Sequence, residues 1–197
     1  MNTDPSKILE LWHYAEGLKL EERALYLSNG RPESVADHSW RLSFMLMMIT
    51  PRISINIDFE RAIKITIAHD ILEIEAGDIS SIQHFGNKEV TEKKIAGEKE
   101  AAESIRNKFG DMGKEIVDLW QEYEDQETDE AKVIKALDKL DARVQAIDDN
   151  NMATFPAESK ATVQEFTKNT EKLCSIDDLL KDLDKLSLKE RQEKWGF

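Results

Sequence analysis

The chain has 197 residues and a formal net charge of -13, with 40 acidic side chains against 27 Lys and Arg. This balance disfavours binding to a nucleic-acid polymer, because duplex affinity depends largely on basic side chains that neutralise phosphates. It still allows a small phosphorylated ligand, which needs only a local cation or a metal ion. The single cysteine, Cys174, excludes an internal disulfide and a thiolate metal cluster.

Two helical segments are predicted at the start of the chain. Asp4 followed by Pro5 is typical of a helix start, with Asp as the N-cap, and Gly17 is expected to end this helix. Residues 18–27 are predicted as a short second helix that contains Arg23. A loop rich in Ser, Asn, Gly and Pro is expected to follow.

The next helix is predicted to begin at Ser34, because Ser34 and Asp37 form an acidic variant of the capping box. Apolar residues then recur at helical spacing and define one core-facing side. This side consists of His38, Leu42, Met45 and Ile49. His38 is therefore predicted to point inward.

Residues 62–78 are predicted to form a buried helix with Asp58 as its cap, since the segment is apolar nearly all round. The polar exceptions are His69, Asp70 and Glu73, whose spacings of three and four residues direct them to one side. Burying two carboxylates and an imidazole together is costly unless something pairs with them. A bound cation is the simplest such partner.

The rest of the chain is also predicted to be helical, with no convincing β alternation anywhere. A polar loop that contains His84 is expected at residues 80–88. The expected helices cover residues 91–108, the region of 116–123, residues 131–147, residues 158–173 and residues 176–188. The helix over 131–147 is expected to start at Thr128 or Asp129. We therefore predict one all-α domain over residues 1–197, with about seven to nine helices. Its C-terminal helices, from about residue 158, are expected to pack on the core.

Three predicted helices each bring metal-ligand side chains to an apolar face. They contribute His38, the pair His69-Asp70, and Asp138, although Asp141 could take the place of Asp138. Each residue alone has a plain explanation, such as a buried structural histidine or a solvated aspartate. Together they suit a divalent cation, because two imidazoles and two carboxylates form a mixed nitrogen and oxygen ligand set.

The same residues carry a family resemblance that runs from about Leu9 to about Ala153. The order His38, His69-Asp70, Asp138 resembles the HD-domain metal-dependent phosphohydrolases. The sequence ESVADHS at residues 33–39 and the sequence HDILE at 69–73 are similar to their 5'-deoxynucleotidase branch, as is KALD at 135–138. The resemblance implies an HD-domain helical bundle that hydrolyses deoxynucleoside 5'-monophosphates.

The resemblance also implies a role for each matching residue. The metal ligands would be His38, His69, Asp70 and Asp138. Glu73 would act in proton transfer at the attacking water, Arg23 would contact the phosphate and sugar, and Asp78 would lie near the deoxyribose. The cofactor would be one divalent ion, with Mn, Co, Ni, Fe, Zn and Mg all compatible with such ligands.

Two departures from the family pattern lie on the substrate side. Ala24 follows Arg23 where bacterial members can carry tryptophan, and residues 79–81 lack a proline-rich turn. Two alternatives therefore stay open: an HD phosphohydrolase for another phosphate ester, or a nucleotide-binding regulatory protein without turnover. A surface ion pair for Arg23 and a turn role for Asp78 are the corresponding structural explanations.

The expected partner is a small nucleotide monophosphate, with no membrane involved. The longest apolar run, at residues 44–49, is too short to cross a bilayer. The first residues lack a basic region followed by an apolar run, so we expect a cytoplasmic protein. A homodimer is expected from family habit and from aromatic residues predicted to be exposed, namely Trp120, Trp195 and Phe197.

Overall fold

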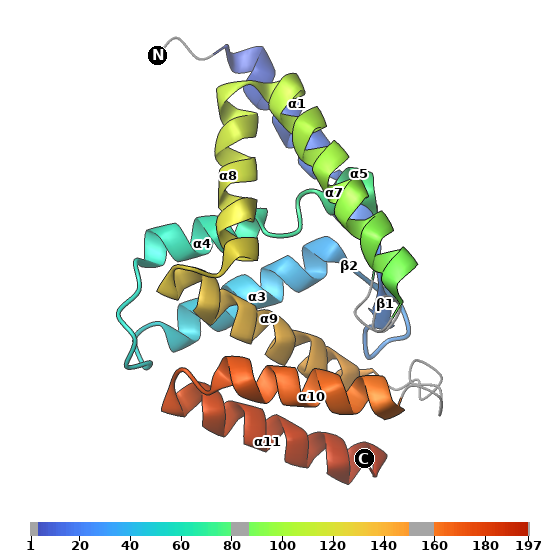
Figure 1. Ribbon diagram of the computed structural model, residues 1–197, viewed down its shortest axis with the longest axis vertical. Helices are drawn as coiled ribbons and strands as arrows, with labels where there is room; N and C mark the ends of the chain where they lie inside the picture. Colours follow the sequence, from blue (N-terminus) through green and yellow to red (C-terminus); the bar gives the residue numbers. More distant parts are fainter. Residues whose placement is uncertain (1–3, 80–86, 150–159, 197) are drawn as a thin grey trace.

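The computed structural model describes residues 4–79, 87–149 and 160–196, where nearly all regular structure is helical (Figure 1). The first part contains α1 (Pro5–Ala15), α2 (Gly17–Leu20), β1 (Glu22–Tyr26), β2 (Pro32–Ser34), α3 (Val35–Ile49), α4 (Phe59–Ala68) and α5 (Glu73–Ala76). The remainder contains α7 (Lys88–Phe109), α8 (Asp111–Asp125), α9 (Asp129–Asp148), α10 (Lys160–Cys174) and α11 (Asp178–Trp195). Eight of these described helices have ten or more residues, in agreement with the prediction.

Hydrogen bonds from backbone N–H groups to N-cap side chains confirm four predicted helix starts. The caps are Asp4, Ser34, Asp58 and Thr128, and each accepts a bond from a backbone N–H in the first turn. Such a cap typically contributes about 1 kcal/mol to stability. At Ser34 the bonding is reciprocal, because the Asp37 carboxylate also accepts from the Ser34 N–H. This box fixes the first turn of α3, the turn that carries His38.

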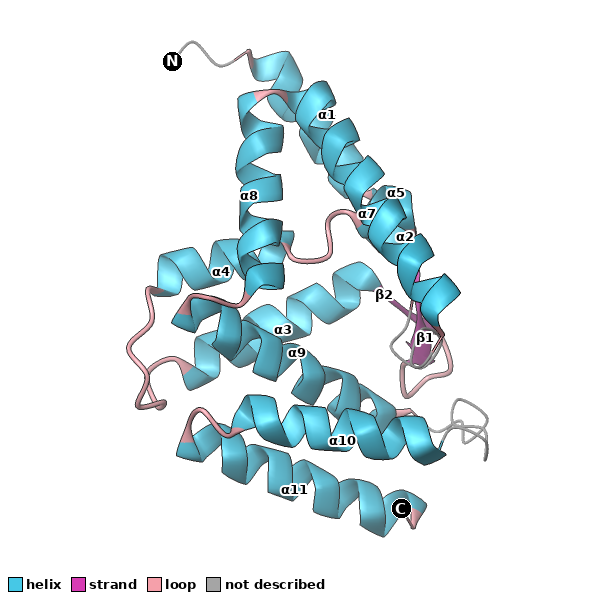
Figure 2. Cartoon of the chain, viewed as in Figure 1, coloured by secondary structure: helices cyan, strands magenta, loops and turns pink. Residues whose placement is uncertain are grey.

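The prediction of a helix over residues 18–27, and of no strand, is wrong. Only α2 is helical there, and the following residues form β1, which pairs antiparallel with β2 (Figure 2). The turn between the strands holds Gly30 at φ 85°, which side-chain-bearing residues rarely adopt. The Asn29 side chain accepts a bond from the Arg31 N–H within that turn. Turn chemistry therefore closes a hairpin, and Arg23 lies on a strand.

The predicted helix over residues 62–78 is interrupted at the residues expected to bind metal. α4 ends before His69, and α5 begins only at Glu73. The His69 Nδ1 bonds the carbonyl oxygen of Thr66, which an unbroken helix would offer to the N–H of Asp70. The prediction of burial all round is also wrong, because one face of α4 is exposed to solvent.

The helices lie in three layers in Figure 1, with α1, α7 and α8 at one end, α3, α4 and α9 in the middle, and α10 and α11 at the other end. Two clusters of buried apolar side chains join them. The first cluster lies among α3, α4, α8 and α9, and the second joins α2, α3, α7 and α8. His38 lies between Val35 of the second cluster and Leu42 of the first. His69 is likewise flanked by a member of each cluster, so both histidines mark the boundary between them.

A buried ion pair ties the C-terminal helices to α9. Arg143 of α9 donates to Asp184 of α11 at 2.5 Å and to the Ser187 hydroxyl at 3.0 Å. Cys174 and Leu180 extend the first apolar cluster into α10 and α11. The organisation of residues 1–197 as a single domain stays a prediction.

The aromatic residues expected on the surface are placed differently. Trp120 and Trp195 are half-buried, and Phe197 lies outside the described residues. Trp40 and Phe44 are exposed on α3, where their rings stack with centroids 6.0 Å apart. The expected homodimer, which also rests on family habit, stays a prediction.

Some predictions fall where the structure gives no description. These are most of the predicted loop with His84 and the predicted helix start at residue 158. Among the helices that are described, none combines the length and the hydropathy needed to span a bilayer.

Cys174 tests whether α10 is docked on the core. Its side chain is fully buried, and burial raises the pKa of its thiol to about 12. Because the thiolate is the reactive form, we expect DTNB at mildly alkaline pH to modify the native protein about a hundredfold or more slowly than the unfolded protein. Absorbance measurements with and without denaturant give both rates. Fast modification of the native protein would show that α10 is not docked as described.

Candidate metal centre

His38 enters the interior from the first turn of α3, and Asp141 of α9 fixes its ring. The His38 Nδ1 lies 2.6 Å from Asp141 Oδ2, and both side chains are buried. Burial raises the pKa of Asp141, but His38 and Arg41 outweigh it and keep that pKa below its usual value. The ionised carboxylate can only accept, so Nδ1 carries the donated proton. In the neutral ring, the His38 Nε2 then presents a lone pair.

His69 is fixed in the same tautomer by the backbone. Its Nδ1 lies 2.8 Å from the Thr66 carbonyl oxygen, which can only accept. The Tyr123 ring meets the buried imidazole edge-on, with centroids 5.0 Å apart. The His69 Nε2 therefore also presents a lone pair, on the side opposite its backbone contact.

The Nε2 atoms of His38 and His69 lie 3.3 Å apart, and a carboxylate oxygen lies close to each of them. Asp138 Oδ1 lies 3.4 Å from the His38 Nε2, and Asp70 Oδ2 lies 3.0 Å from the His69 Nε2. Four electron-rich atoms this close repel one another unless a positive charge lies among them. Ligand atoms of His38, His69 and Asp138 all lie within 4.8 Å of one another, close enough to bind one metal ion. The donor set fits a borderline divalent cation.

The surrounding carboxylates also favour a proton on His38. Burial and the Arg23 charge lower the pKa of His38, but Asp138 and Asp141 outweigh them and raise it to about 9. The pKa values of Asp70 and Asp138 are lowered despite their burial, because His69 and His38 favour the ionised form of Asp70, and Lys139 followed by the same imidazoles favours that of Asp138. A divalent ion would compete with the His38 proton for the same point.

One carboxylate oxygen of Asp138 faces the proposed metal position, and the other accepts hydrogen bonds from neighbouring side chains. The Tyr123 hydroxyl donates to Asp138 Oδ2 at 2.6 Å, and the Lys139 ammonium donates to the same oxygen at 2.9 Å. Asp141, which the sequence leaves open as an alternative ligand, instead contacts the Nδ1 side of His38. This placement favours Asp138 over Asp141 as the ligand.

Glu73 begins α5, one short turn after the His69-Asp70 pair. Its Oε2 is buried and has no hydrogen-bond partner among the described residues. Burial and the nearby charges of Asp70 and Asp78 raise its pKa well above the usual value. This carboxyl group therefore binds a proton more readily than an ordinary carboxylate does.

Arg23 approaches the cluster from strand β1, and Asp78 approaches it from the segment after α5. The Arg23 guanidinium lies 3.7 Å from Asp70 Oδ2, and its Nε donates to Glu33 at 3.1 Å. The backbone N–H of Asp78 donates to Glu21 Oε1 at 2.8 Å, which fixes the end of the α5 segment. Burial raises the pKa of Asp78, which is also sensitive to the charges of Arg23 and Asp70. The structure thus brings all seven predicted site residues into one region.

Comparisons with known proteins place this geometry in a family. A model of the HD domain matches residues 15–179. The chain belongs to the HD domain family. The resemblance inferred from the motifs is thereby confirmed.

Named relatives of this HD domain chain occur in several organisms. The 5'-deoxynucleotidase HDDC2 of Dictyostelium discoideum is 35% identical over 173 residues, covering 84% of this chain and 88% of that protein. The protein of the same name from Danio rerio is 35% identical over 148 residues, covering 75% of this chain and 68% of its own length. A solved structure described as a predicted metal-dependent phosphohydrolase from Magnetospirillum magnetotacticum has a TM-score of 0.73, covers 94% of this chain and 95% of its own, and is 23% identical. This last likeness supports the HD domain fold.

Four residues that hold the proposed ligands or their neighbours in place are not predicted in that role from the sequence. They are Glu33, Arg41, Tyr123 and Asp141. Arg41 follows His38 by three residues on the same helix, so helical spacing could have indicated a common face. The Tyr123 ring is buried, and its hydroxyl bond to Asp138 on another helix leaves no trace in apolar periodicity.

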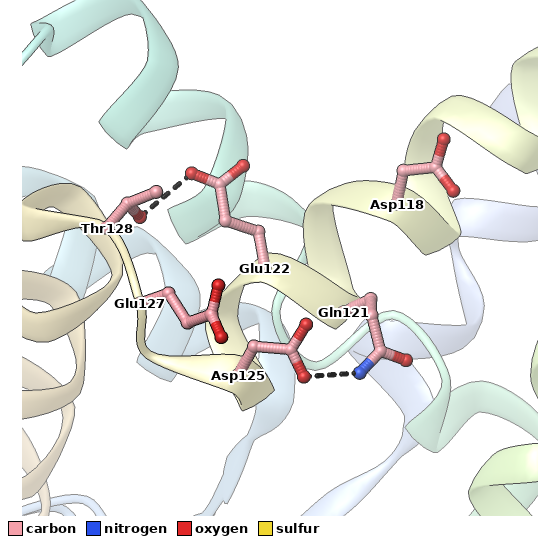
Figure 3. Close-up of a pocket in the computed structure, with 6 residues that line it drawn as sticks. All are labelled: Asp118, Gln121, Glu122, Asp125, Glu127 and Thr128. Atoms are coloured by element: carbon pink, nitrogen blue, oxygen red, sulfur yellow. Dashed lines mark hydrogen bonds between the residues drawn. The ribbon is translucent and has the colours of Figure 1, made fainter.

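A shallow surface pocket near the C-terminal end of α8 is separate from this centre (Figure 3). It is lined by Asp118, Gln121, Glu122, Asp125, Glu127 and Thr128. Two of its polar contacts are internal, since Thr128 donates to Glu122 and Gln121 donates to Asp125. None of the predicted site residues lines this pocket, so it adds nothing to the chemistry of the HD domain.

Loss of one ligand should release the ion. We expect the purified protein to carry about one divalent ion per chain, and the His69→Ala and Asp70→Ala variants to lose it, because the remaining donors no longer surround one point. Elemental analysis after dialysis measures the metal content. His13→Ala, at an exposed position of α1, is the matched control and should keep the ion. Equal metal content in all four proteins would rule out the proposed ligands.

Proposed function

We propose that this chain is a metal-dependent phosphomonoesterase that hydrolyses deoxynucleoside 5'-monophosphates to deoxynucleoside and phosphate. The observation that carries the proposal is the convergence of His38, His69 and Asp138 on one point, with Asp70 Oδ2 3.0 Å from the His69 Nε2. Relatives named 5'-deoxynucleotidase, at 35% identity over most of this chain, support the substrate class.

The four converging residues would hold the ion, and their mixed donor set suits Mn, Co, Ni, Fe, Zn or Mg. When bound there, a divalent ion supplies charge stabilisation at a phosphate oxygen and lowers the pKa of a coordinated water. The protein maintains the geometry by fixing both imidazoles and Asp138 through a further layer of hydrogen bonds.

Glu73 is the proposed proton acceptor for the attacking water. A general base needs a pKa above that of an ordinary carboxylate to hold the proton it takes, and the pKa of Glu73 is raised. Its Oε2 is buried beside the ligand cluster and has no other partner in the described part of the chain. Glu73 is therefore suited to take a proton without first breaking a hydrogen bond.

Arg23 is the proposed contact for the substrate phosphate. Its guanidinium lies beside Asp70 at the edge of the ligand cluster and retains 14% side-chain exposure. A local cation matters in this chain, because a net charge of -13 repels an anionic substrate at long range. Asp78, on the segment after α5, is the proposed neighbour of the deoxyribose.

Two other functions make different predictions. A phosphohydrolase for another ester would keep the same ligands and differ around Arg23 and Asp78, where Ala24 and residues 79–81 depart from the family pattern. A regulatory protein without turnover would be indicated by a missing ligand, yet all four ligand types are present. A homodimer also stays part of the proposal, to be decided by light scattering.

A panel of nucleotides distinguishes these functions. We expect deoxynucleoside 5'-monophosphates to release phosphate at least about tenfold faster than ribonucleotides, and di- and triphosphates hardly to react, because among the described residues a single arginine, Arg23, is paired with a proposed ligand. Colorimetric phosphate release, with Mn or Co added and then with chelator, measures this. Equal rates for ribonucleotides would favour the other phosphohydrolase, and binding without turnover would favour the regulatory protein.

Replacement of Glu73 tests the mechanism separately. Glu73→Ala should keep the ion and the fold but lose turnover by about a hundred- to ten-thousandfold, the usual contribution of a general base. Glu75→Ala is the matched control, since Glu75 shares α5 but bonds Tyr14 and Ser104 at the surface. Metal analysis, nucleotide binding and turnover are measured on both variants. Near-normal turnover in Glu73→Ala would show a structural role, and loss of the ion would make Glu73 a ligand.

A further inference from the structure

A chain of alternating charges connects two of the proposed metal ligands behind the site. In order of contact, its members are Asp70, Arg23, Glu33, Arg41, Asp141 and His38. Glu33 is the central carboxylate, and it lies on β2, the strand paired with the strand of Arg23. No role has been assigned to Glu33 by the motifs or by the proposed chemistry.

Glu33 is an unusual residue to find in the interior. Its side chain is 1% exposed, and a buried carboxylate is unfavourable unless cations or hydrogen-bond donors surround it. Its two oxygens face two arginines: Oε2 accepts from the Arg23 Nε at 3.1 Å, and Oε1 lies 3.7 Å from an Arg41 nitrogen. Glu33 is thus held between two guanidinium groups.

The two arginines depend on Glu33 to different degrees. Arg41 has further strong partners, because its Nε lies 2.5 Å from Asp141 Oδ1 and its Nη1 lies 3.1 Å from Asp148 Oδ2. Among the described residues, the hydrogen bond of the Arg23 side chain goes to Glu33, and the contact with Asp70 is a longer ion pair of 3.7 Å. Loss of the Glu33 charge should therefore release Arg23 and leave Arg41 in place.

We propose that Glu33 is a positioning residue that holds the Arg23 guanidinium beside Asp70, where it meets the phosphate of the substrate. The inference rests on the proposed function, in which Arg23 contacts that phosphate. A guanidinium is a planar fork, so a bond at Nε fixes its plane and leaves the two terminal nitrogens for an anion. Glu33 occupies the Nε side and thereby directs the terminal nitrogens to the ligand cluster.

The test is Glu33→Gln, which keeps the size of the side chain and removes its charge. We expect the variant, loaded with metal, to bind inorganic phosphate about tenfold or more weakly and to raise KM for a deoxynucleoside monophosphate by a similar factor. Metal content should match the wild type, because Glu33 contacts no proposed ligand directly. Calorimetry, steady-state kinetics and elemental analysis give the three readouts.

A matched control separates positioning from general stability. Asp184→Asn removes the charge of another buried carboxylate that pairs with an arginine, Arg143, between α9 and α11. It should lower the unfolding temperature as Glu33→Gln does, while phosphate affinity and KM stay at the wild-type values. An equal loss of phosphate affinity in both variants would overturn the proposal.

A double variant tests whether Glu33 acts through Arg23. Arg23→Ala should weaken phosphate binding, and the addition of Glu33→Gln should cause no further loss, because the residue that Glu33 positions is already gone. Additive losses would overturn the proposal, as would unchanged phosphate binding in Glu33→Gln. If Glu33→Gln does not fold, Glu33→Asp keeps the charge on a shorter arm and should give a smaller loss of phosphate affinity; a wild-type affinity in that variant would count against positioning.

Failure of the proposed function would look different from failure of this inference. A wild-type protein that binds metal and phosphate but hydrolyses no deoxynucleoside monophosphate would refute the substrate assignment. The comparison of phosphate affinities between wild type, Glu33→Gln and Asp184→Asn would still decide the role of Glu33.

Discussion

The structure depends on two hydrogen bonds that fix the imidazole tautomers at the centre of the chain. Asp141 takes the Nδ1 proton of His38, and the Thr66 carbonyl takes that of His69. Both bonds lie on the outer side of the rings and leave the inner nitrogens electron-rich across 3.3 Å. Repulsion between these nitrogens and the adjacent carboxylates makes the point between them selective for positive charge. The ligand arrangement is therefore set by the protein before any ion arrives.

The interruption between α4 and α5 follows from the same requirement. In a continuous helix the Thr66 carbonyl would accept from a backbone amide, and His69 would have no fixed partner there. Ending α4 frees that carbonyl for the imidazole and lets Asp70 and Glu73 approach the cluster from a tight turn. The cost of a broken helix is offset by a second layer of contacts that orients the ligands.

Local signals predicted the helices well, because caps such as Ser34 and apolar spacing act over a few residues. The proposed ligands lie in three short motifs, which is why the sequence could indicate them. The hairpin was missed because its strands have five and three residues, too few for alternation to stand out. The bond between His38 and Asp141 joins residues 103 positions apart, and Glu33 meets its two arginines only after β1 and β2 pair. Such contacts arise from tertiary packing and leave no local pattern.

The candidate metal centre lies at the boundary between the two apolar clusters, and this position couples its geometry to their packing. On α3, Val35 packs in the second apolar cluster and Leu42 packs in the first apolar cluster. His38 lies between these two residues. Because packed interiors transmit displacement with little compression, a shift of one cluster against the other moves the ligands relative to one another. A substitution deep inside either cluster can thus change ion affinity while every helix stays intact. The spacing of the proposed ligands therefore depends on how the two apolar clusters are aligned.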